Sequence, residues 1–416
     1  MTLPKRCDRL LALVLIGSMI GALVGCGHSA SVTGPPSPDT AAVEKIDLFW
    51  QGMDDVHTYR IPGIVVTARG TVLAYCEARR FSAADRGEIE IHLRRSTDGG
   101  RTWSAPQMIA HRGERISRNP YMPDAKLEKD LGGPEEQTVN NPMAIADRDG
   151  TVHFVYCVEY RHAFYMRSDD DGLTWSEPCD ITATFEDFRP AVNWQSFATG
   201  PGHGIQLSNG RLLVPVWLAD YRREATVRRA ASVIFSDDGG HSWQAGELAI
   251  TGGTESAVAE RPDGSVLMST RNPSQRRALA VSADGATHWS ATRFADELPE
   301  AGCMAGLVRH PGDALEPGPL LLFSNPHTTQ RPNRYRHNVS IKLSRDGGDT
   351  WPVHRVLEPG PSAYSDLAVL PDGTILCFYE SGDPEVVRRG RDWAYARLRL
   401  ARFSLDWLRE GKEEAP

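Results

Sequence analysis

Ser96-Thr-Asp98-Gly-Gly100-Arg-Thr102-Trp103 is an eight-residue segment that recurs along this chain. Its pattern returns at residues 168–175, 236–243 and 344–351, and a fifth segment, 282–289, keeps the Ser, Asp and Trp but loses one Gly and the Thr. Ser and Asp side chains bond nearby backbone N–H groups, Gly accepts positive φ, and Trp buries its ring beside the turn. We therefore interpret each segment, called a box below, as a structural turn, and its return indicates a repeat architecture.

A second repeat, a β-hairpin signal, lies between the boxes. Each copy is a short β run, an Asx-Gly or similar turn, and another β run. The copies span residues 64–75, 143–156, 204–214, 256–268, a looser one at 306–323, and 367–376. The last hairpin is followed by the strand-like run 396–403 without a box, and we expect residues 46–49 to join this last module.

The alternation of hairpin and box predicts the fold. Each module holds two hairpin strands, a third strand that leads into the box and a fourth that leaves it. Six such modules predict an all-β domain at residues 44–410, a six-bladed β-propeller of four-stranded antiparallel blades with the boxes as turns. A β-sandwich would not need so long a period, and no helical periodicity competes.

The N-terminus is expected to lie outside this domain. A basic start precedes an apolar run at residues 10–23 that is too short to span a membrane comfortably. Leu-Val-Gly before Cys26 resembles the cleavage box of bacterial lipoproteins, in which the Cys becomes the lipidated first residue. We expect a lipoprotein-type signal peptide at 1–26, a flexible tether at 27–43, and export to the bacterial envelope with membrane attachment through Cys26. An uncleaved anchor is the weaker alternative.

Composition narrows the possible partners. The net charge of −8 argues against a general attraction to nucleic acid. The domain holds an odd set of cysteines, which favours buried thiols over a disulfide framework: Cys76, Cys157, Cys179, Cys303 and Cys377. No CxxC pair or His-rich cluster suggests a metal, and no cofactor is expected.

The predicted propeller places particular positions on one face. If the boxes lie on the lower face, the upper face carries the starts of strands one and three and the ends of strand two. These positions hold polar residues from different modules: Arg60, Glu77, Arg79, Asn141, Glu255, Arg277, Arg336, Tyr364 and Glu380, with Asp85 in the loop just beyond a second strand. A single charge at a strand end is ordinary. Three arginines from different modules suggest an anionic ligand, most naturally a carboxylate.

Several motifs resemble one enzyme family. Tyr59-Arg-Ile-Pro62 is similar to the arginine-bearing motif of bacterial exo-α-sialidases (neuraminidases), and the boxes resemble the Asp boxes of that family. Residues 200–205, 254–256 and 363–367 are also similar, and the likeness covers residues 45–405. The resemblance implies hydrolysis of terminal α-linked sialic acids from glycoproteins, glycolipids or oligosaccharides.

The resemblance also implies roles for the arginines. Arg60, Arg277 and Arg336 would grip the carboxylate of the sialic acid, and Glu380 would hold Arg60 in position. The spacing from the boxes favours Arg277 over Arg276 and, less securely, Arg336 over Arg334. Either Arg79 or Arg80 would line the pocket near the ring substituents, and Asn141 belongs to the same substrate-binding set.

Tyr364 would be the nucleophile. Sialic acid carries its carboxylate on the anomeric carbon, so a neutral phenol avoids the repulsion that a carboxylate nucleophile would meet. Because the ordinary pKa of tyrosine is about 10, it needs a base, and Glu255 fits that role. Asp85 would protonate the leaving oxygen and later activate water, so that the covalent intermediate leads to net retention.

Three other readings remain open at this point. The domain could be a sialoglycan-binding propeller without catalysis, although such a binder would not need Asp85, Glu255 and Tyr364 together. It could transfer sialic acid, or act on a related nonulosonic acid. A purely structural propeller would leave the arginines and Tyr364 without a reason to share one face.

Overall fold

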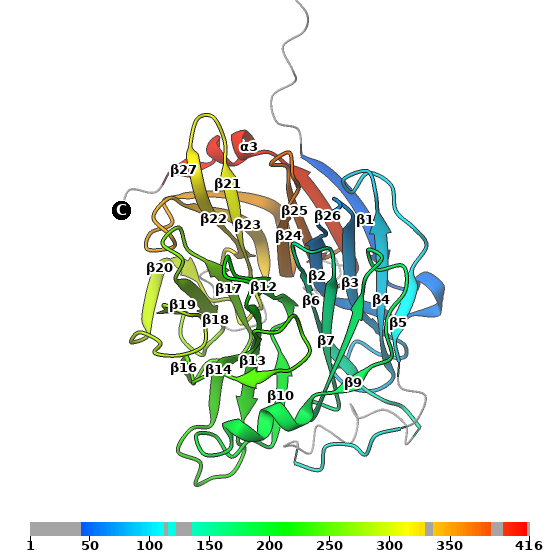
Figure 1. The fold of residues 1–416 in the computed structure, drawn as a ribbon. Helices are drawn as coiled ribbons and strands as arrows, with labels where there is room; N and C mark the ends of the chain where they lie inside the picture. The colour runs from blue at the N-terminus through cyan, green and yellow to red at the C-terminus, as the bar shows by residue number, and fades with distance from the viewer. Residues whose placement is uncertain (1–42, 112–114, 122–134, 329–335, 384–393, 414–416) are drawn as a thin grey trace, which may run out of the picture. The chain divides into compact units, whose positions relative to one another are not determined.

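β-Strands account for most of the described chain. The computed structural model of the protein describes residues 43–111, 115–121, 135–328, 336–383 and 394–413, all within one compact unit, Thr40–Pro416 (Figure 1). Among the described residues, helix is limited to three short segments: η1 (Met53–Asp55), η2 (Thr182–Phe188) and α3 (Leu405–Arg409). The prediction of an all-β domain is confirmed.

The predicted signal peptide, Cys26 and all of the predicted tether except Val43 lie outside the described residues. Within the described ranges, no helix has the length and apolar character needed to cross a membrane.

Two of the sheets are plain four-stranded antiparallel meanders. The first contains β2 (Thr58–Val66), β3 (Val72–Arg79), β4 (Ile89–Ser96) and β5 (Gln107–Ala110). The second contains β17 (Ser256–Glu260), β18 (Val266–Thr270), β19 (Arg276–Ser282) and β20 (Arg293–Pro299).

Two further sheets carry additional short strands. One contains β6 (Val139–Ala146), β7 (Val152–Val158), β8 (His162–Ser168) and β9 (Cys179–Asp180), with β11 (Gly202–His203) parallel to β6. The other contains β10 (Ser196–Thr199), β12 (Ile205–Gln206), β13 (Leu212–Ala219), β14 (Arg229–Ser236), β15 (Gln244–Ala245) and β16 (Ile250–Thr251).

The last sheet joins two four-stranded groups through one long strand. It contains β21 (Gly306–Gly312), β22 (Pro317–Pro326), β23 (His337–Ser344), β24 (Val353–Val369), β25 (Ile375–Ser381), β26 (Arg397–Phe403), β1 (Glu44–Trp50) and β27 (Lys412–Glu413). The first half of β24 pairs with β23 and its second half with β25. The expected pairing of the N-terminal run with the last module is confirmed, because β1 pairs with β26.

Neighbouring sheets pack against each other in chain order. β2 contacts β6, β6 contacts β10, β13 contacts β17, β17 contacts β21, and β24 contacts β2. Figure 1 shows the same succession in its colour order, from blue through green and yellow to red. Apolar side chains fill the space between sheets, as where the ring of Tyr75 from β3 meets that of Phe154 from β7 edge-on at 5.2 Å.

The boxes are hydrogen-bonded turns, as predicted. In the first, Gly100 N–H donates to Ser96 Oγ at 2.8 Å, and the Asp98 carboxylate accepts the N–H of Thr102 at 2.9 Å and its hydroxyl at 2.6 Å. The boxes at 168–175, 236–243 and 344–351 repeat these bonds. All partners lie within four residues of each other, which explains why the sequence alone reveals the turn.

The fifth box corrects one detail of the sequence analysis. This box retains the threonine function, because Thr287 bonds the Asp284 carboxylate through both its N–H, at 2.8 Å, and its hydroxyl, at 3.0 Å. The turn is one residue tighter, so Thr287 occupies the place held by the seventh residue in the other boxes.

Two glycines with positive φ, Gly348 in a box and Gly70 in a hairpin turn, allow the cost of backbone strain to be separated from the cost of a steric clash. Gly348 has φ +92°, and an added Cβ would lie 2.3 Å from the Cδ2 atom of the fully buried Leu267, whereas Gly70 has φ +83° with open space around it. We expect Gly70→Ala to lower the free energy of unfolding by about 1–2 kcal/mol, the cost of a left-handed backbone. Gly348→Ala should cost clearly more in urea denaturation, because it adds a clash. Equal losses would contradict this account of the box.

Candidate active site

One pocket collects most of the predicted site residues. Its volume is about 770 Å³, and its lining includes Arg60, Arg79, Asp85, Asn141, Glu255, Arg336 and Tyr364. These residues lie on β2, β3, β6 and β24 or in segments beside strands, so separate sheets contribute to one cavity. Glu380 lies behind the lining, on β25.

A β-bulge directs Arg60 into the pocket. The pairing of β2 with β3 shifts between Arg60 and Gly63, and Ile61 has φ +62°, which is rare for a β-branched residue. The following Pro62 has no N–H to donate to the ladder. Because of this irregular stretch, the Arg60 side chain does not have to follow the regular alternation of side chains between the two faces of the sheet.

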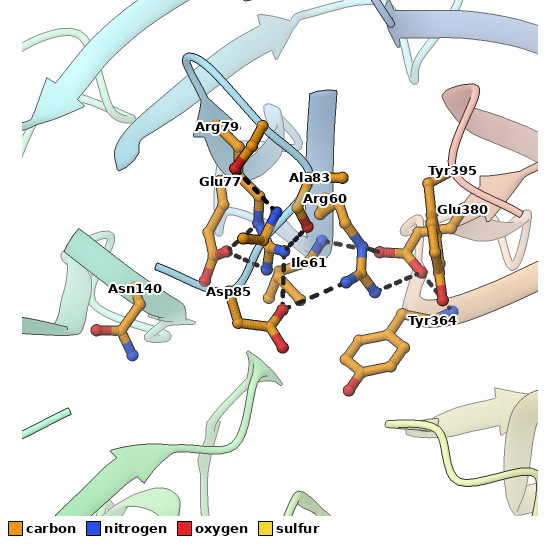
Figure 2. Close-up of polar contacts among 12 residues, drawn as sticks. Arg60, Ile61, Glu77, Arg79, Ala83, Asp85, Asn140, Tyr364, Glu380 and Tyr395 are labelled. Carbon is orange, nitrogen blue, oxygen red and sulfur yellow. Dashed lines mark hydrogen bonds and ion pairs between the residues drawn. The ribbon is translucent and has the colours of Figure 1, made fainter. Parts of the chain in front are cut away.

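Glu380 holds Arg60, as predicted. The Arg60 Nε atom donates to Glu380 Oε1 at 2.9 Å and Nη2 donates to Oε2 at 3.2 Å, and Figure 2 shows this two-pronged contact. The same carboxylate accepts the backbone N–H of Ile61 at 3.2 Å and of Tyr364 at 3.1 Å. Because the Glu380 side chain is fully buried, the guanidinium has little freedom to turn away.

Arg79, rather than Arg80, lines the pocket. It donates to Glu77 Oε2 through Nη2 at 2.7 Å and to Asp85 Oδ1 through Nη1 at 2.8 Å (Figure 2). Arg80 points elsewhere and pairs with Glu90 at 2.6 Å. Successive strand residues face opposite sides, so only one of two adjacent arginines can face the cavity.

Asp85 is an ionised carboxylate beside two arginines. Its side chain is 69% exposed, and Arg60 Nη1 lies 3.4 Å from Oδ1 in addition to Arg79. The pocket walls desolvate the group and raise its pKa, but Arg79 and Arg60 outweigh this effect and hold the pKa of Asp85 well below its usual range. In the free protein, therefore, Asp85 does not carry a proton at neutral pH.

Tyr364 lies at the centre of a polar cluster. Its hydroxyl donates to Glu255 Oε1 at 2.6 Å, and Arg271 Nη1 donates to the Tyr364 oxygen at 2.9 Å and to Glu255 Oε2 at 2.7 Å. Burial and the neighbouring Glu255 carboxylate raise the pKa of Tyr364 well above its ordinary value, against the opposing effect of Arg271 and Arg336. The phenol is neutral, and its hydroxyl is hydrogen-bonded to a carboxylate.

Arg271 occupies the place expected for Arg277. The prediction that Arg277 lines the pocket is wrong, because its guanidinium is fully buried and binds Ser269, Glu300 and the Cys303 carbonyl. Arg271 directly follows β18 and faces the cavity. The sequence contained a signal for Arg271: like Arg79, it lies at the end of the second strand of its module, a position that the sequence analysis had assigned to the face of the site.

Arg336 and Tyr395 complete the floor. Arg336 Nη1 donates to the Tyr395 hydroxyl at 3.0 Å, and Nη2 donates to the Gly302 carbonyl. The Arg60 guanidinium lies 3.9 Å from the centre of the Tyr395 ring, a cation–π contact (Figure 2). The sequence analysis missed Tyr395, which precedes β26 and belongs to none of the recognised motifs.

The side chain of Asn141 is held mainly by the protein. The side-chain amide of Asn141 donates to the Thr199 carbonyl at 3.1 Å, and the backbone N–H of Asn141 donates to Glu77 Oε1 at 2.8 Å. It lines the pocket from β6. The sequence analysis predicted that Asn141 faces the pocket. Its contacts indicate that it supports the Glu77–Arg79 pair and has little freedom to adjust to a ligand.

Aromatic residues form another part of the lining, which the sequence analysis also missed. Tyr160 and Trp217 lie with ring centres 6.1 Å apart, and Tyr221 lies in the same cavity. The Tyr160 hydroxyl donates to the backbone carbonyl of Asp85 at 3.1 Å. Such rings offer flat apolar surfaces to a ligand.

Outside the pocket lining, one group has side chains close enough to share a metal ion. It consists of Glu88, Glu90 and His111, and it is the only such group among the described residues. Glu90 already pairs with Arg80 and His92. None of the three residues belongs to the lining of the pocket that contains Tyr364.

Comparison with known proteins shows a BNR repeat-like domain and similarity to sialidases. A family model described as a BNR repeat-like domain matches residues 70–377. The chain is 32% identical to a sialidase of Micromonospora viridifaciens, over 98% of this chain and 61% of the relative, and 33% identical to a sialidase of Bacteroides fragilis, over 79% and 61%. It thus spans about three fifths of these relatives. The structure resembles Hadza microbial sialidase Hz136 with a TM-score of 0.71 at 27% identity, over 88% of this chain and 69% of that one.

The buried pair of Glu380 and Arg60 allows a stability test. Glu380→Gln leaves the buried Arg60 with only the 3.4 Å contact to the exposed Asp85 carboxylate as a counter-charge, so we expect the free energy of unfolding to fall by about 3–5 kcal/mol. Glu186→Gln is the matched control, because Glu186 forms an exposed pair with Arg189 and should cost less than about 1 kcal/mol. Urea denaturation measures both. Similar small losses would show that Arg60 finds another partner.

Proposed function

This chain belongs to the family with a BNR repeat-like domain, and we propose that it is an exo-α-sialidase that hydrolyses terminal α-linked sialic acids from glycoconjugates. One arrangement carries the proposal: Tyr364 is bonded to Glu255 and surrounded by three guanidinium groups. Arg271 contacts its hydroxyl at 2.9 Å, and the guanidinium carbons of Arg60 and Arg336 lie 5.4 Å and 5.1 Å from its ring centre.

The three arginines favour a substrate with a carboxylate next to the reacting carbon. Guanidinium groups bind carboxylates through paired N–H donors, and Arg60, Arg271 and Arg336 all lie around Tyr364. A ligand whose carboxylate sits among them brings the adjacent carbon close to the tyrosine oxygen. In a sialic acid that carbon is the anomeric one.

The proposed reaction has two displacement steps. Glu255 accepts the phenolic proton while the Tyr364 oxygen forms a bond to the anomeric carbon, and the bond to the leaving oxygen breaks as Asp85 donates a proton to it. Water then loses a proton to Asp85 and attacks the same carbon. The bond to Tyr364 breaks, its oxygen recovers a proton from Glu255, and the sugar keeps its configuration.

Asp85 must be protonated for the first step, although the free protein holds it ionised. A bound carboxylate among the arginines offsets part of the positive charge of Arg60, which otherwise lowers the pKa of Asp85. Partial exclusion of water by the sugar acts in the same direction. Substrate binding is therefore expected to raise the pKa of Asp85 and prepare the acid.

We also propose that the sheets form a six-bladed β-propeller. The contacts of β2 with β6, and of β24 with β2, support a ring of neighbouring sheets. The division of the last sheet at β24 supports two blades within it, the final one completed by β1. A ring brings residues from distant modules to one face, as the pocket requires.

The substrates and location belong to the same proposal. We propose that sialylated glycoproteins, glycolipids or oligosaccharides are the partners. We further propose that Cys26 attaches the exported protein to the bacterial envelope by a lipid, on its periplasmic or outer side. The motif before Cys26 and the basic and apolar run that precedes it support this placement.

The test of the activity is release of free sialic acid by the purified protein from a panel of α-linked sialosides, including a fluorogenic aryl sialoside. Hydrolysis supports the proposal. Transfer to an added sugar instead of to water would indicate a trans-sialidase, and cleavage only of related nonulosonic acids would change the substrate class. Binding of sialosides by a folded protein without any cleavage would indicate a sialoglycan-binding protein.

Tyr364→Phe removes the nucleophilic oxygen but keeps the ring. We expect kcat to fall by roughly 10²-fold or more, with binding of a sialic acid analogue retained, as measured by steady-state kinetics and calorimetry. Tyr165→Phe is the control, since Tyr165 is a buried, hydrogen-bonded tyrosine outside the pocket lining, and it should leave kcat unchanged. Equal loss of binding in Tyr364→Phe would assign this residue to recognition instead.

Asp85→Asn removes the general acid. We expect kcat to fall by roughly 10²–10⁴-fold on a sialoside with an alkyl leaving group, and much less on an aryl sialoside whose leaving group needs no proton. The wild-type kcat for the alkyl substrate should decline as pH rises through the pKa of bound Asp85, and the variant should lack this limb. Equal losses on both substrates would contradict an acid role.

A further inference from the structure

Arg277 has a structural role of its own. We propose that Arg277 and Glu300 form a buried pair that positions Arg336, through the turn at residues 300–303, for recognition of the substrate carboxylate. This inference rests on the proposed function, and it makes Arg277 a positioning residue outside the cavity.

The first step is the fixed placement of Arg277. Its guanidinium is fully buried and donates from Nε to Ser269 Oγ at 3.2 Å and from Nη2 to the Ser269 carbonyl at 3.2 Å. Its Nη1 atom donates to Glu300 Oε2 and to the Cys303 carbonyl, both at 2.9 Å. Arg277 therefore links β18 to both ends of the 300–303 turn.

The second step is the shape of that turn. Glu300 Oε1 accepts the N–H of Gly302 at 2.7 Å and that of Cys303 at 3.2 Å, so one carboxylate binds the turn and Arg277 together. Gly302 has φ +67°, a conformation that favours glycine. Glu300 and Gly302 line the pocket, which places the turn at its floor.

The third step connects the turn to Arg336. The Gly302 carbonyl accepts an N–H from Arg336 Nη2, and among the described residues the other hydrogen-bond partner of this guanidinium is the neutral hydroxyl of Tyr395. Within the described part of the chain, Arg336 has no carboxylate partner comparable to Glu380 on Arg60. Its direction depends on neutral oxygen atoms, and the one on Gly302 is held by Glu300 and Arg277.

This arrangement suits carboxylate recognition. A carboxylate partner would neutralise Arg336 and compete with the ligand, whereas a backbone carbonyl orients the guanidinium and leaves its charge for the ligand. The negative charge of Glu300 is directed instead at Arg277, 2.9 Å away. The pair thus fixes the direction of the turn, and because it is buried, replacement of one partner is expected to lower stability as well.

Loss of the pair should weaken binding more than turnover. The ligand carboxylate is held in both the ground state and the transition state, so a misdirected Arg336 raises KM with little effect on kcat. A displacement of about 1 Å in a positioning group can cost up to roughly 10²-fold. A misplaced nucleophile would lower kcat instead.

The experiment compares Arg277→Lys and Glu300→Gln with Arg276→Gln. The neighbouring Arg276 is exposed and pairs with Asp296, so its variant should behave as wild type. For the two test variants we expect KM, and the Kd of a carboxylate-bearing sialic acid analogue measured by calorimetry, to rise about 10-fold or more, with kcat within about threefold. Thermal unfolding confirms that each variant is folded.

A double-variant cycle with Arg336→Lys separates positioning from general structure. If Arg277 acts through Arg336, Arg277→Lys should weaken analogue binding little further when Arg336 is already replaced. Additive losses, or a lowered melting temperature with unchanged Kd, would overturn the inference. Binding of the analogue can be measured without turnover. If the wild-type protein binds the analogue but cleaves no sialoside, the proposed hydrolysis is refuted, and the binding measurements still test whether Arg277 positions Arg336.

Discussion

The buried charge of Arg60 is the constraint on which the site depends. A guanidinium in a protein interior is tolerated only with a counter-charge and bonded N–H groups, and Glu380 supplies the counter-charge from a position 320 residues away in the sequence. The same carboxylate accepts the N–H groups of Ile61 and Tyr364. The buried Glu380 side chain thus links β2, β24 and β25, and it fixes the positions of both Arg60 and Tyr364 in the pocket.

The remaining charges differ in how they are balanced. Arg79 and Arg271 face carboxylates within 3 Å, Glu77 and Glu255 respectively, while Arg336 is directed by neutral oxygens. The pocket therefore combines guanidinium groups that are paired with carboxylates and one that has only neutral hydrogen-bond partners among the described residues. The neighbouring Arg79 and Arg60 hold the pKa of Asp85 well below its usual range, and in the proposed function this links recognition of the substrate to the protonation of Asp85.

Much of the fold was accessible from the sequence because its signals are local. A box bonds residues no more than four positions apart, and a hairpin turn is specified by Asx-Gly between two β runs. Even so, the fifth box retained its threonine bond through Thr287, one position earlier than in the other boxes. A turn that is shorter by one residue can keep the hydrogen bond between Asp and Thr, although a position-by-position comparison of the sequences misses it.

The sequence by itself determined the all-β class, the repeating strands, and the motif residues Arg60 and Tyr364. Only the tertiary structure decided that Arg271 enters the pocket while Arg277 lies beneath it, and that Tyr395 joins the floor. The physical reason is the range of the contacts. Turn bonds form within one short segment, whereas pocket residues are selected by side-chain directions at strand ends and by packing between sheets, which spacing along the chain does not encode.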